Sequence, residues 1–498
     1  MNVLFIITDQ HRADHMSCAG NTVLKTPNLD RLASEGVRFT SAFVANPICM
    51  PNRASIFTGL YPNMHGIRTA GMNLPEDVPT FTETLRNNGY RTAEVGKIHL
   101  NWAIRPLDKN ANSHETGKDW IMKHEHPQLP LPYYGFEEVE LVVGHGMICG
   151  GHYMDWLEEK GPQYVPIIRK KAKTFFGKMY FRTDIPEELY PTTYVTERSI
   201  AFLERYANGN YGDKPFFLNI SYPDPHHPVN PPGKYYDMYK AEDMKLPASY
   251  NDIENVKNHK FLKPLLNNSF FRGMILRISK EKEVKEFIAA TYGAVAMIDD
   301  GIGQILAALE KLGLADNTIV IYTSDHGDLM GDHGMILKGP CPFNGILNVP
   351  FIWKVPGMTK SGVITDSLAS SIDISKTILN LVGIDEKEQP RDMQGVDLTP
   401  VLQNPNENVR DCCLVEHDEE IEMFNVKLRC RHLITEKFKL SVYDGVEGYG
   451  DLFDREKDPE ELNNLWFSNP DLRHELVEKL LFANLKAQSR YPKRKAIS

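Results

Sequence analysis

The sequence predicts an α/β fold: a large mixed, mostly parallel sheet flanked by helices, followed by a smaller C-terminal α+β domain. Short, wholly apolar runs alternate with helical patterns up to about residue 404, and several short strands and one closing helix follow. The 498 residues are 42% apolar and 24% charged, which is enough for a large core. We therefore expect an α/β domain at residues 1–404 and a short antiparallel sheet plus helix at residues 405–498.

The alternation is clear near the amino terminus. Val3–Thr8 is an apolar run, typical of a strand buried on both faces. Thr26-Pro27 opens a helix, with Thr as N-cap and Pro as its first residue. Thr80–Glu83 has capping-box spacing, Gly89 ends the helix that follows, and Arg91–Val95 is the next expected strand.

Residues 101–190 interrupt this regularity. They are rich in Pro, Gly, His and aromatic residues and have little periodicity, so we interpret them as an insert that shapes a substrate pocket. The elements expected after the insert are helices near Tyr194–Tyr206, Val284–Leu312, Ile374–Val382 and Pro470–Ala487, and strands at Phe216–Ser221, Thr318–Thr323, Cys412–Glu416 and Phe438–Tyr443.

Charge and composition exclude several classes of partner. The net charge is −10, and the only basic block is the short run Lys493-Arg494-Lys495, so nucleic acid is not an expected substrate. Val3–Ile7 is too short for a signal peptide and has no basic residues before it, and no apolar run approaches the ~18 residues of a membrane span. Seven scattered cysteines do not suggest a disulfide framework. We expect a cytoplasmic protein without membrane contact.

Two strand ends carry similar polar pairs. Asp9-Gln10 follows the first strand, and Asp325-His326 follows the strand at Thr318–Thr323. The carboxyl ends of parallel strands meet at one edge of a sheet, where ligands bind. Either aspartate alone is as readily explained by capping of the next turn, but the matched pair indicates a site for one divalent cation.

A cysteine and an arginine mark a second feature. Pro51 predicts the first turn of a helix that ends near Gly59, so Cys49 lies at a helix N-terminus, where backbone N–H groups favour an anion. Arg53 follows one turn later and can lie on the same side. The alternative is an ordinary buried cysteine, but the Cys-x-Pro-x-Arg spacing favours an anion-binding site with a nucleophile.

Five motifs resemble those of the sulfatase family, in the alkaline phosphatase superfamily. Cys49-x-Pro51-x-Arg53 is similar to the signature whose Cys is oxidised to formylglycine. The other motifs are Gly89–His99, which resembles the second signature, Asp224–Pro228, which resembles the His-x-Pro motif, Gly334–Lys338, which resembles the segment with the second active-site lysine, and the C-terminal stretch Leu452–Leu465. The resemblance covers nearly the whole chain except the insert.

The resemblance implies a metal site and a modified nucleophile. One divalent ion, usually calcium in this family, with manganese or magnesium as alternatives, would be held by Asp9, Gln10, Asp325, His326 and the formylglycine made from Cys49. Such an ion would activate a hydroxyl of the hydrated formylglycine for attack on the ester.

The resemblance also assigns residues to the substrate. Arg53, Lys97 and Lys338 would neutralise the non-bridging oxygens. His226 would bind the ester or protonate the leaving alcohol, with His227 as a neighbouring competitor, and His99 would accept the proton when sulfate is released. Taken singly, either motif histidine is more simply an ordinary buried one.

Two departures keep a second function open. The Asp9-Gln10 and Asp325-His326 pairs resemble the phosphonate monoester hydrolase branch of the superfamily, whereas Gly96–His99 is sulfatase-like. A cysteine phosphatase would need five residues between Cys and Arg, and a two-metal phosphatase would need Ser or Thr as nucleophile. A catalytically inactive sulfatase-like binding protein would be expected to lose Cys49 or Arg53, and both are present.

The predicted function is therefore that of a sulfuric ester hydrolase acting on a sulfate monoester. A phosphonate monoester or phosphodiester hydrolase is the alternative. The expected partners are a small-molecule or saccharide sulfate ester and a maturation enzyme that makes formylglycine. Trp102, Trp120, Tyr133 and Tyr134 of the insert are candidates for stacking on a sugar or aryl ring. The sequence names neither the released alcohol, nor the metal, nor the oligomeric state.

Overall fold

A nine-stranded sheet forms the centre of the protein. The structure, a computed structural model, describes residues 1–103, 112–122, 128–174, 178–268, 276–421 and 424–488. The strand order is β12-β2-β11-β9-β1-β7-β4-β5-β6. The bounds are β1 (Asn2–Thr8), β2 (Val37–Phe39), β4 (Arg91–Gly96), β5 (Glu138–His145), β6 (Ile148–Gly151), β7 (Phe216–Ser221), β9 (Thr318–Ser324), β11 (Phe351–Lys354) and β12 (Val363–Thr365). Strands β9, β1, β7, β4 and β5 are parallel, whereas β11 and β6 pair antiparallel with their neighbours. The predicted mixed, mostly parallel sheet is confirmed.

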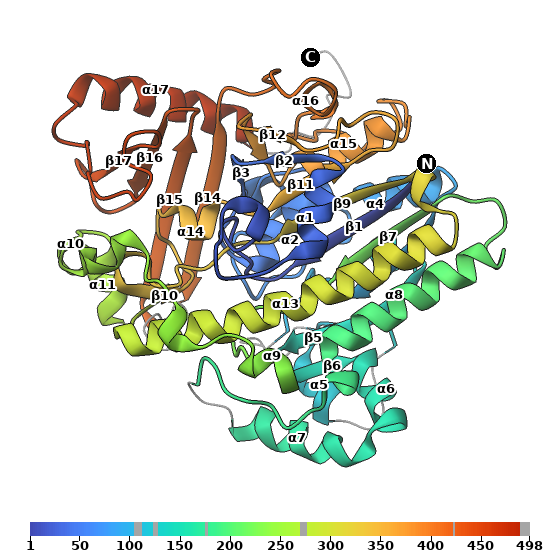
Figure 1. Cartoon of the computed structure of the whole chain (residues 1–498). Coiled ribbons are helices and arrows are strands. Elements are labelled where there is room, and N and C mark those ends of the chain that lie inside the picture. The colour runs from blue at the N-terminus through green and yellow to red at the C-terminus, as the bar shows by residue number, and fades with distance from the viewer. Residues whose placement is uncertain (104–111, 123–127, 175–177, 269–275, 422–423, 489–498) are drawn as a thin grey trace.

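Helices cover both faces of this sheet. Alternate residues of β1 enter two different cores: Val3, Phe5 and Ile7 pack on one face, and Leu4 and Ile6 on the other. The first face carries α2 (Cys49–Thr58), α4 (Phe81–Asn87) and α15 (Asp373–Leu381), and the second carries α1 (Pro27–Ser34), α8 (Pro191–Ala207) and α13 (Glu281–Lys311). Figure 1 shows α8 and α13 crossing the sheet on the viewer's side. Both faces are apolar because a parallel sheet of this kind is buried on both sides.

Shorter elements connect this framework. The helices are α3 (Pro62–His65), α5 (Gly117–Met122), α6 (His152–Lys160), α7 (Val165–Thr174), α9 (Gly233–Asp237), α10 (Ile253–Asn258), α11 (Leu262–Asn267), α14 (Asn344–Leu347) and α16 (Thr399–Gln403). The strands pair as β3 (Ala42–Phe43) with β13 (Ala369–Ser370) and as β8 (Leu276–Ile278) with β10 (Met335–Leu337).

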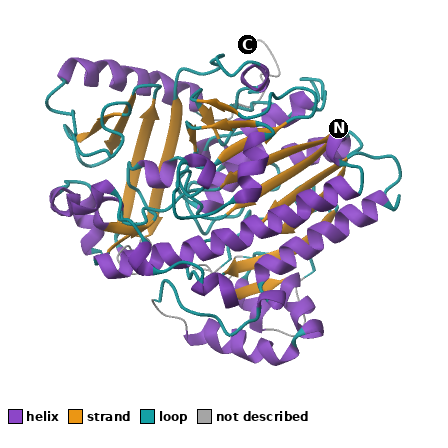
Figure 2. Ribbon diagram, viewed as in Figure 1, coloured by secondary structure: helices purple, strands orange, loops and turns teal. Residues whose placement is uncertain are grey.

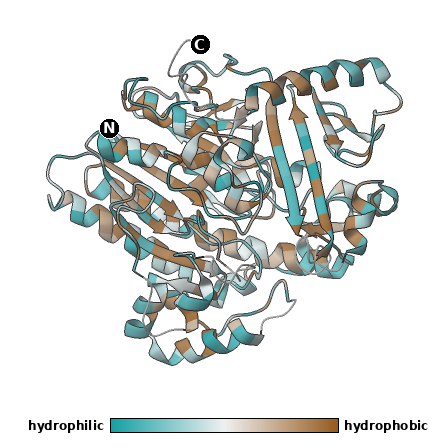
Figure 3. Ribbon diagram, turned by 180° about the vertical axis from the view of Figure 1, so that it is seen from behind, coloured by the Kyte–Doolittle hydropathy of each residue, from teal (hydrophilic) through white to brown (hydrophobic). Residues whose placement is uncertain are grey.

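A separate four-stranded antiparallel sheet forms the C-terminal part, as predicted. It consists of β14 (Cys413–Ile421), β15 (Val426–Ile434), β16 (Phe438–Tyr443) and β17 (Gly450–Asp454), and α17 (Pro470–Ala487) packs against it. Figure 2 shows this sheet beside the main one. Its strands mix apolar and polar residues, whereas those of the main sheet are mostly apolar (Figure 3). The division at residue 404 stays a prediction.

The two N-caps that the sequence predicts have different outcomes. The Thr80 side chain accepts a hydrogen bond from the backbone N–H of Glu83, so the predicted N-cap of α4 is confirmed. Thr26 is different: its hydroxyl is bonded to Ser17 and Asp30 and does not cap α1. A tertiary partner has replaced the local hydrogen bond that the sequence predicted.

The insert at residues 101–190 is more regular than expected. It contains α5, α6, α7, β5 and β6, and β5 extends the main sheet by pairing parallel to β4. Trp120 is 0% exposed and its indole N–H donates to the carbonyl of His114, while buried Tyr133 donates its hydroxyl to Glu115. The prediction that these two rings stack on a substrate is therefore wrong, because they belong to the core that covers the sheet.

Within the part of the chain that the structure describes, no helix combines the length and the apolar character that a bilayer span requires.

Candidate active site

The candidate site lies at the carboxyl edge of the parallel strands. Thr8 of β1 is in register with Ser324 of β9, and Ile7 with Ser221 of β7. Gly96 of β4 is likewise in register with Ser221 and with Leu141 of β5. Every side chain that directly follows these strands therefore reaches the same edge of the sheet. This geometry gathers residues that are more than 300 positions apart in the sequence.

The two predicted polar pairs meet at this edge. His326 Nε2 is 3.4 Å from Asp9 Oδ1 and 3.6 Å from Asp325 Oδ1. His326 Nδ1 lies 2.8 Å from the carbonyl oxygen of Gly327, which can only accept, so Nδ1 carries a proton and Nε2 is the nitrogen that faces the two carboxylates. Asp9 Oδ1 and Gln10 Oε1 are buried and have no hydrogen-bond partner among the described residues. Buried oxygens without donors, beside an imidazole nitrogen, are suited to a cation.

The structure also explains how Gln10 is oriented. Its side-chain amide donates to Asp328 Oδ2 at 2.5 Å and to His227 Nδ1 at 3.2 Å, which leaves Oε1 free. Asp328 Oδ1 accepts from the backbone N–H groups of Met330 and Leu337. Asp328 thus fixes the Gln10 amide, a role that its position after Asp325-His326 did not reveal.

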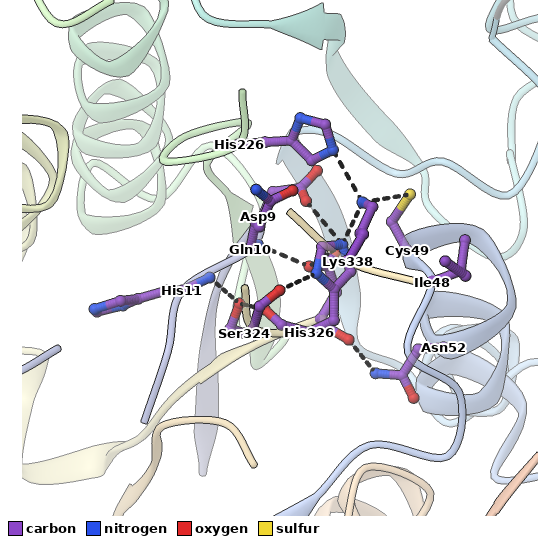
Figure 4. A network of polar contacts seen from close by, with 12 residues as sticks. Asp9, Gln10, His11, Ile48, Cys49, Asn52, His226, Ser324, His326 and Lys338 are labelled. Atoms are coloured by element: carbon purple, nitrogen blue, oxygen red, sulfur yellow. Dashed lines mark hydrogen bonds and ion pairs between the residues drawn. The ribbon is translucent and has the colours of Figure 1, made fainter. Parts of the chain in front are cut away.

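Cys49 is the first residue of α2, as the sequence predicts, and faces this group of side chains (Figure 4). The helix is anchored by Asn52, whose amide donates to the backbone carbonyl of Asp325 at 2.6 Å. Arg53 is 0% exposed; its Nε donates to Asp325 Oδ2 at 2.7 Å, and its Nη1 donates to the carbonyl of Lys97 and to Ser221 Oγ. The helix that carries Cys49 is therefore locked onto the strand ends.

Positive charge gathers around the Cys49 thiol. Lys338 Nζ lies 3.9 Å from Cys49 Sγ, 2.6 Å from His326 Nε2 and 2.9 Å from His226 Nε2 (Figure 4). Burial raises the pKa of the Cys49 thiol, but the charges of Lys338, His99 and Lys97 outweigh it and hold that pKa well below its usual range. An overall acidic protein thus concentrates cations at one point, which is the arrangement that an anionic substrate needs.

Lys97 enters from the end of β4. Its ammonium forms an ion pair with Asp9 Oδ2 and lies 2.7 Å from His145 Nε2. Burial raises the pKa of Asp9, but the charges of Lys97 and His226 outweigh it and hold the carboxyl ionised, with a pKa well below its usual range. The Asp9 carboxylate therefore presents one oxygen to Lys97 and the other towards His326.

The structure distinguishes the two adjacent histidines. His226 Nδ1 is 2.5 Å from the carbonyl oxygen of His227, so Nε2 is the nitrogen that faces Lys338. His227 instead faces Gln10. Asp9, His226 and His326 also bring ligand atoms within 4.8 Å of one another, so His226 borders the cation group as well as the substrate side.

His99 is held by a residue that the sequence reasoning missed. The Glu115 carboxylate accepts hydrogen bonds from the backbone N–H groups of His99, Leu100 and Asn101, at 2.7 to 3.1 Å. His99 itself has φ +58°, an unusual conformation for a residue other than glycine. Glu115 thus stabilises a strained turn that carries a predicted active-site residue, although nothing in the sequence around Glu115 indicates this role.

All ten predicted site residues therefore lie in one group: Asp9, Gln10, Cys49, Arg53, Lys97, His99, His226, Asp325, His326 and Lys338. Three further residues reach it that the sequence did not single out: Glu115, His145 and Asp328. Asp328 stands next to a recognised motif, whereas the other two come from the insert.

Comparison with known proteins gives consistent matches along the chain. Residues 1–384 match the family described as Sulfatase, and residues 331–489 match the one described as N-sulphoglucosamine sulphohydrolase, C-terminal. An arylsulfatase of Clostridium perfringens (strain 13 / Type A) is 32% identical over 93% of this chain and 90% of its own. An N-acetylglucosamine-6-O-sulfatase of Bacteroides thetaiotaomicron is 26% identical over 93% of this chain and 82% of its own.

A solved structure of the other branch is also similar. The phosphonate monoester hydrolase of Agrobacterium radiobacter aligns with a TM-score of 0.79 and 26% identity, over 98% of this chain and 96% of that one. The mixture of motifs in the sequence thus has a counterpart in the relatives.

Proposed function

This chain belongs to the sulfatase family of sulfuric ester hydrolases, and from that premise we propose that it cleaves a sulfate monoester with a formylglycine derived from Cys49 and one divalent cation. The observation that supports this proposal is the convergence on Cys49. A helix N-terminus, three cationic side chains and a group of unpaired metal-type donors all lie around one buried residue.

The donor set fits one hard divalent ion. Asp9, Gln10 and Asp325 supply oxygens, and His326 supplies one nitrogen, Nε2, which lies 2.6 Å from Lys338 Nζ. We propose calcium as the usual ion of this family, with manganese or magnesium as alternatives suited to the nitrogen ligand. When bound, the ion would lower the pKa of a coordinated hydroxyl and polarise the ester.

The modification of Cys49 must precede folding. Every residue from Cys49 to Thr58 is buried, so the maturation enzyme that we propose as a partner has to read the segment in an unfolded chain. The oxidised side chain would supply a hydroxyl nucleophile in its hydrated form. At the start of α2, backbone N–H groups favour the negative charge that develops there.

Three cations are placed to hold the sulfate oxygens. Arg53, Lys97 and Lys338 are all buried, which strengthens their interaction with an anion. Arg53 Nη2 has no hydrogen-bond partner in the described part of the chain and is free to donate to a substrate. Lys97 is fixed by Asp9, so an ammonium remains at the corner where a diester would carry its second organic group.

Two histidines are available for proton transfer. We propose that His226 contacts the ester oxygen through Nε2, the nitrogen that faces Lys338, and in its protonated form donates a proton to the leaving alcohol. His99 Nδ1 is buried without a hydrogen-bond partner among the described residues, which suits it to accept the proton as sulfate is released.

The substrate is proposed to be a saccharide or aryl sulfate. Relatives named for arylsulfatase and N-acetylglucosamine-6-O-sulfatase activity support both classes. The similarity to a phosphonate monoester hydrolase, with Gln10 and His326 at the metal group, supports phosphonate or phosphodiester hydrolysis as the second candidate. We favour sulfate because Gln10 and His326 would contact the ion, whereas Lys97 would contact the substrate.

The test is a comparison of kcat/KM for aryl sulfate, aryl phosphonate and aryl phosphodiester on fully modified, metal-loaded protein. The sulfate should be preferred. If kcat/KM for either phosphorus ester exceeds that for aryl sulfate by more than tenfold, or about 1.4 kcal/mol of transition-state preference, phosphonate or phosphodiester hydrolysis replaces sulfate hydrolysis as the proposed function. Absence of turnover on all three by fully modified protein would support an inactive binding protein.

A further inference from the structure

His145 reaches the active site from the end of the insert strand β5. This strand is parallel to β4, so its carboxyl end lies at the same edge of the sheet as Lys97. The His145 side chain is 25% exposed, whereas that of Lys97 behind it is 3% exposed. His145 therefore contacts Lys97 from a more exposed position.

Two contacts tie the His145 ring to residues of the proposed reaction. Its Nε2 lies 2.7 Å from Lys97 Nζ, and because an ammonium can only donate, Nε2 is the acceptor. Its ring stacks on that of His226, with centroids 3.6 Å apart and planes inclined by 14°. Nε2 is also 3.4 Å from Asp9 Oδ2, the oxygen that pairs with Lys97.

The hairpin that carries His145 is anchored to the loop that carries His226. The backbone N–H of Met147, at the tip between β5 and β6, donates to Asn230 Oδ1 at 2.8 Å. Asn230 in turn donates its amide to the carbonyl of Pro228 at 3.0 Å. Gly146 has φ +52°, and a Cβ there would lie 2.5 Å from that same carbonyl oxygen, so the tip approaches the loop more closely than another residue permits.

We propose that His145 is a positioning residue that holds the Lys97 ammonium in its corner and thereby sets the preference for sulfate monoesters over diesters. This inference rests on the proposed function. Lys97 is held by Asp9 on one side and by His145 on the other, so its ammonium cannot swing aside for a second organic substituent. Loss of the His145 acceptor leaves the ammonium held by Asp9 alone, so that it can move, which weakens sulfate binding and relieves the crowding that excludes diesters.

Two substitutions distinguish the role of the His145 Nε2 hydrogen-bond acceptor from that of the His145 ring. His145→Phe keeps an aromatic ring on His226 but has no acceptor for Lys97. His145→Gln places an amide oxygen at about the reach of Nε2 but removes the ring. The matched control is His152→Phe in the same part of the insert, which removes the acceptor of the Leu141 backbone N–H at 2.8 Å without touching Lys97.

The expected result is a change in selectivity with His145→Phe alone. Its kcat/KM for aryl sulfate should fall about 10- to 100-fold, as for a lost charge-assisted hydrogen bond, while that for aryl phosphodiester falls less or rises. His145→Gln should recover most of the loss. His152→Phe should lower the Tm and leave the sulfate-to-diester ratio within about twofold of the original. An unchanged ratio in His145→Phe would overturn the inference, and so would failure of His145→Gln to improve on it.

A binding measurement separates this inference from the proposed function. Inorganic sulfate should raise the Tm of the original protein and of His145→Gln more than that of His145→Phe. If the original protein does not hydrolyse aryl sulfate, the proposed function fails, and the binding measurement still decides on His145. Equal stabilisation of all three proteins by sulfate would contradict the positioning role.

Discussion

The two sides of the active site are built from different kinds of segment. On one side, Asp9, Cys49 and Asp325 each stand at a strand end or a helix start that the sequence marks. On the other, Glu115 and His145 come from the insert, in which no motif points to them. The first side contains the groups proposed to hold the ion and attack the ester, and the second positions Lys97 and His99, two of the residues proposed to act on the substrate.

The residues proposed for the chemical step and the residues proposed to determine substrate selectivity therefore lie on different sides of the site. The side that contains Asp9, Cys49 and Asp325, here called the marked side, could be predicted from local sequence patterns. These patterns are a polar pair after an apolar strand and a cysteine before a helical turn. The insert side depends on β5 joining the sheet in register with β4, a contact that no local pattern specifies. Changes on the marked side should therefore abolish turnover, and changes on the insert side should modulate it.

The largest effect is expected from Cys49→Ala. Because Cys49 is the proposed precursor of the nucleophile, kcat should fall by at least about 10⁴-fold while the Tm changes little. Peptide mass spectrometry of the active, unsubstituted protein should show a loss of about 18 Da at this residue. Cys18→Ala is the control and should keep full activity, because Cys18 packs against the core on the other face of the sheet from α2. Full turnover by wholly unmodified thiol would contradict the mechanism.

Asp325→Asn should remove the ion as well as turnover. Asp325 faces the ion group and pairs with buried Arg53, so metal analysis should fall from one ion per chain to a small fraction, and kcat by at least about 10³-fold. The unpaired guanidinium should also cost about 3–5 kcal/mol of unfolding free energy. Asp332→Asn removes one of the two carboxylates that pair with the buried Arg12, which keeps its pair with Asp14, and should lose less stability and keep the ion. Two tightly bound ions in the unsubstituted protein would favour a phosphatase.

Glu115→Gln tests the insert side through His99. The amide can accept fewer of the three backbone N–H groups, so the turn at His99 should loosen and kcat should fall about tenfold with little change in KM. Glu138→Gln, which removes the carboxylate partner of Arg205 and one of the two carboxylate partners of Arg91 at the start of β5, should leave kcat unchanged. Equal effects of both substitutions would mean that Glu115 has no specific role.

The smallest effect on activity is expected from Trp120→Phe. Trp120 is fully buried, so the smaller ring should cost about 1–3 kcal/mol of unfolding free energy and leave the KM for aryl sulfate within about twofold. Thermal unfolding and steady-state kinetics on the same preparation check both values. A KM raised more than tenfold would restore the idea that this ring contacts the substrate.

The sequence by itself determined the fold class and most of the site. β7 and β16 have the bounds that the sequence predicts, because buried strands are apolar runs and their ends are polar or contain turn residues. The pairs Asp9-Gln10 and Asp325-His326 could be assigned to one edge because all parallel strands end on the same side of a sheet. The helix at Cys49 could be placed from Pro51 and Gly59 alone.

Only the tertiary structure decided which residues of the insert reach the site. His145 depends on the pairing of β5 with β4 and on the contact between Met147 and Asn230, which are 83 positions apart. Trp120 and Tyr133 are of the residue types that line sugar-binding surfaces, but both lie in the core. They pack there because the edge of the sheet must be covered by apolar side chains. Burial and long-range hydrogen bonds depend on where distant segments meet, and a local pattern carries no information about that.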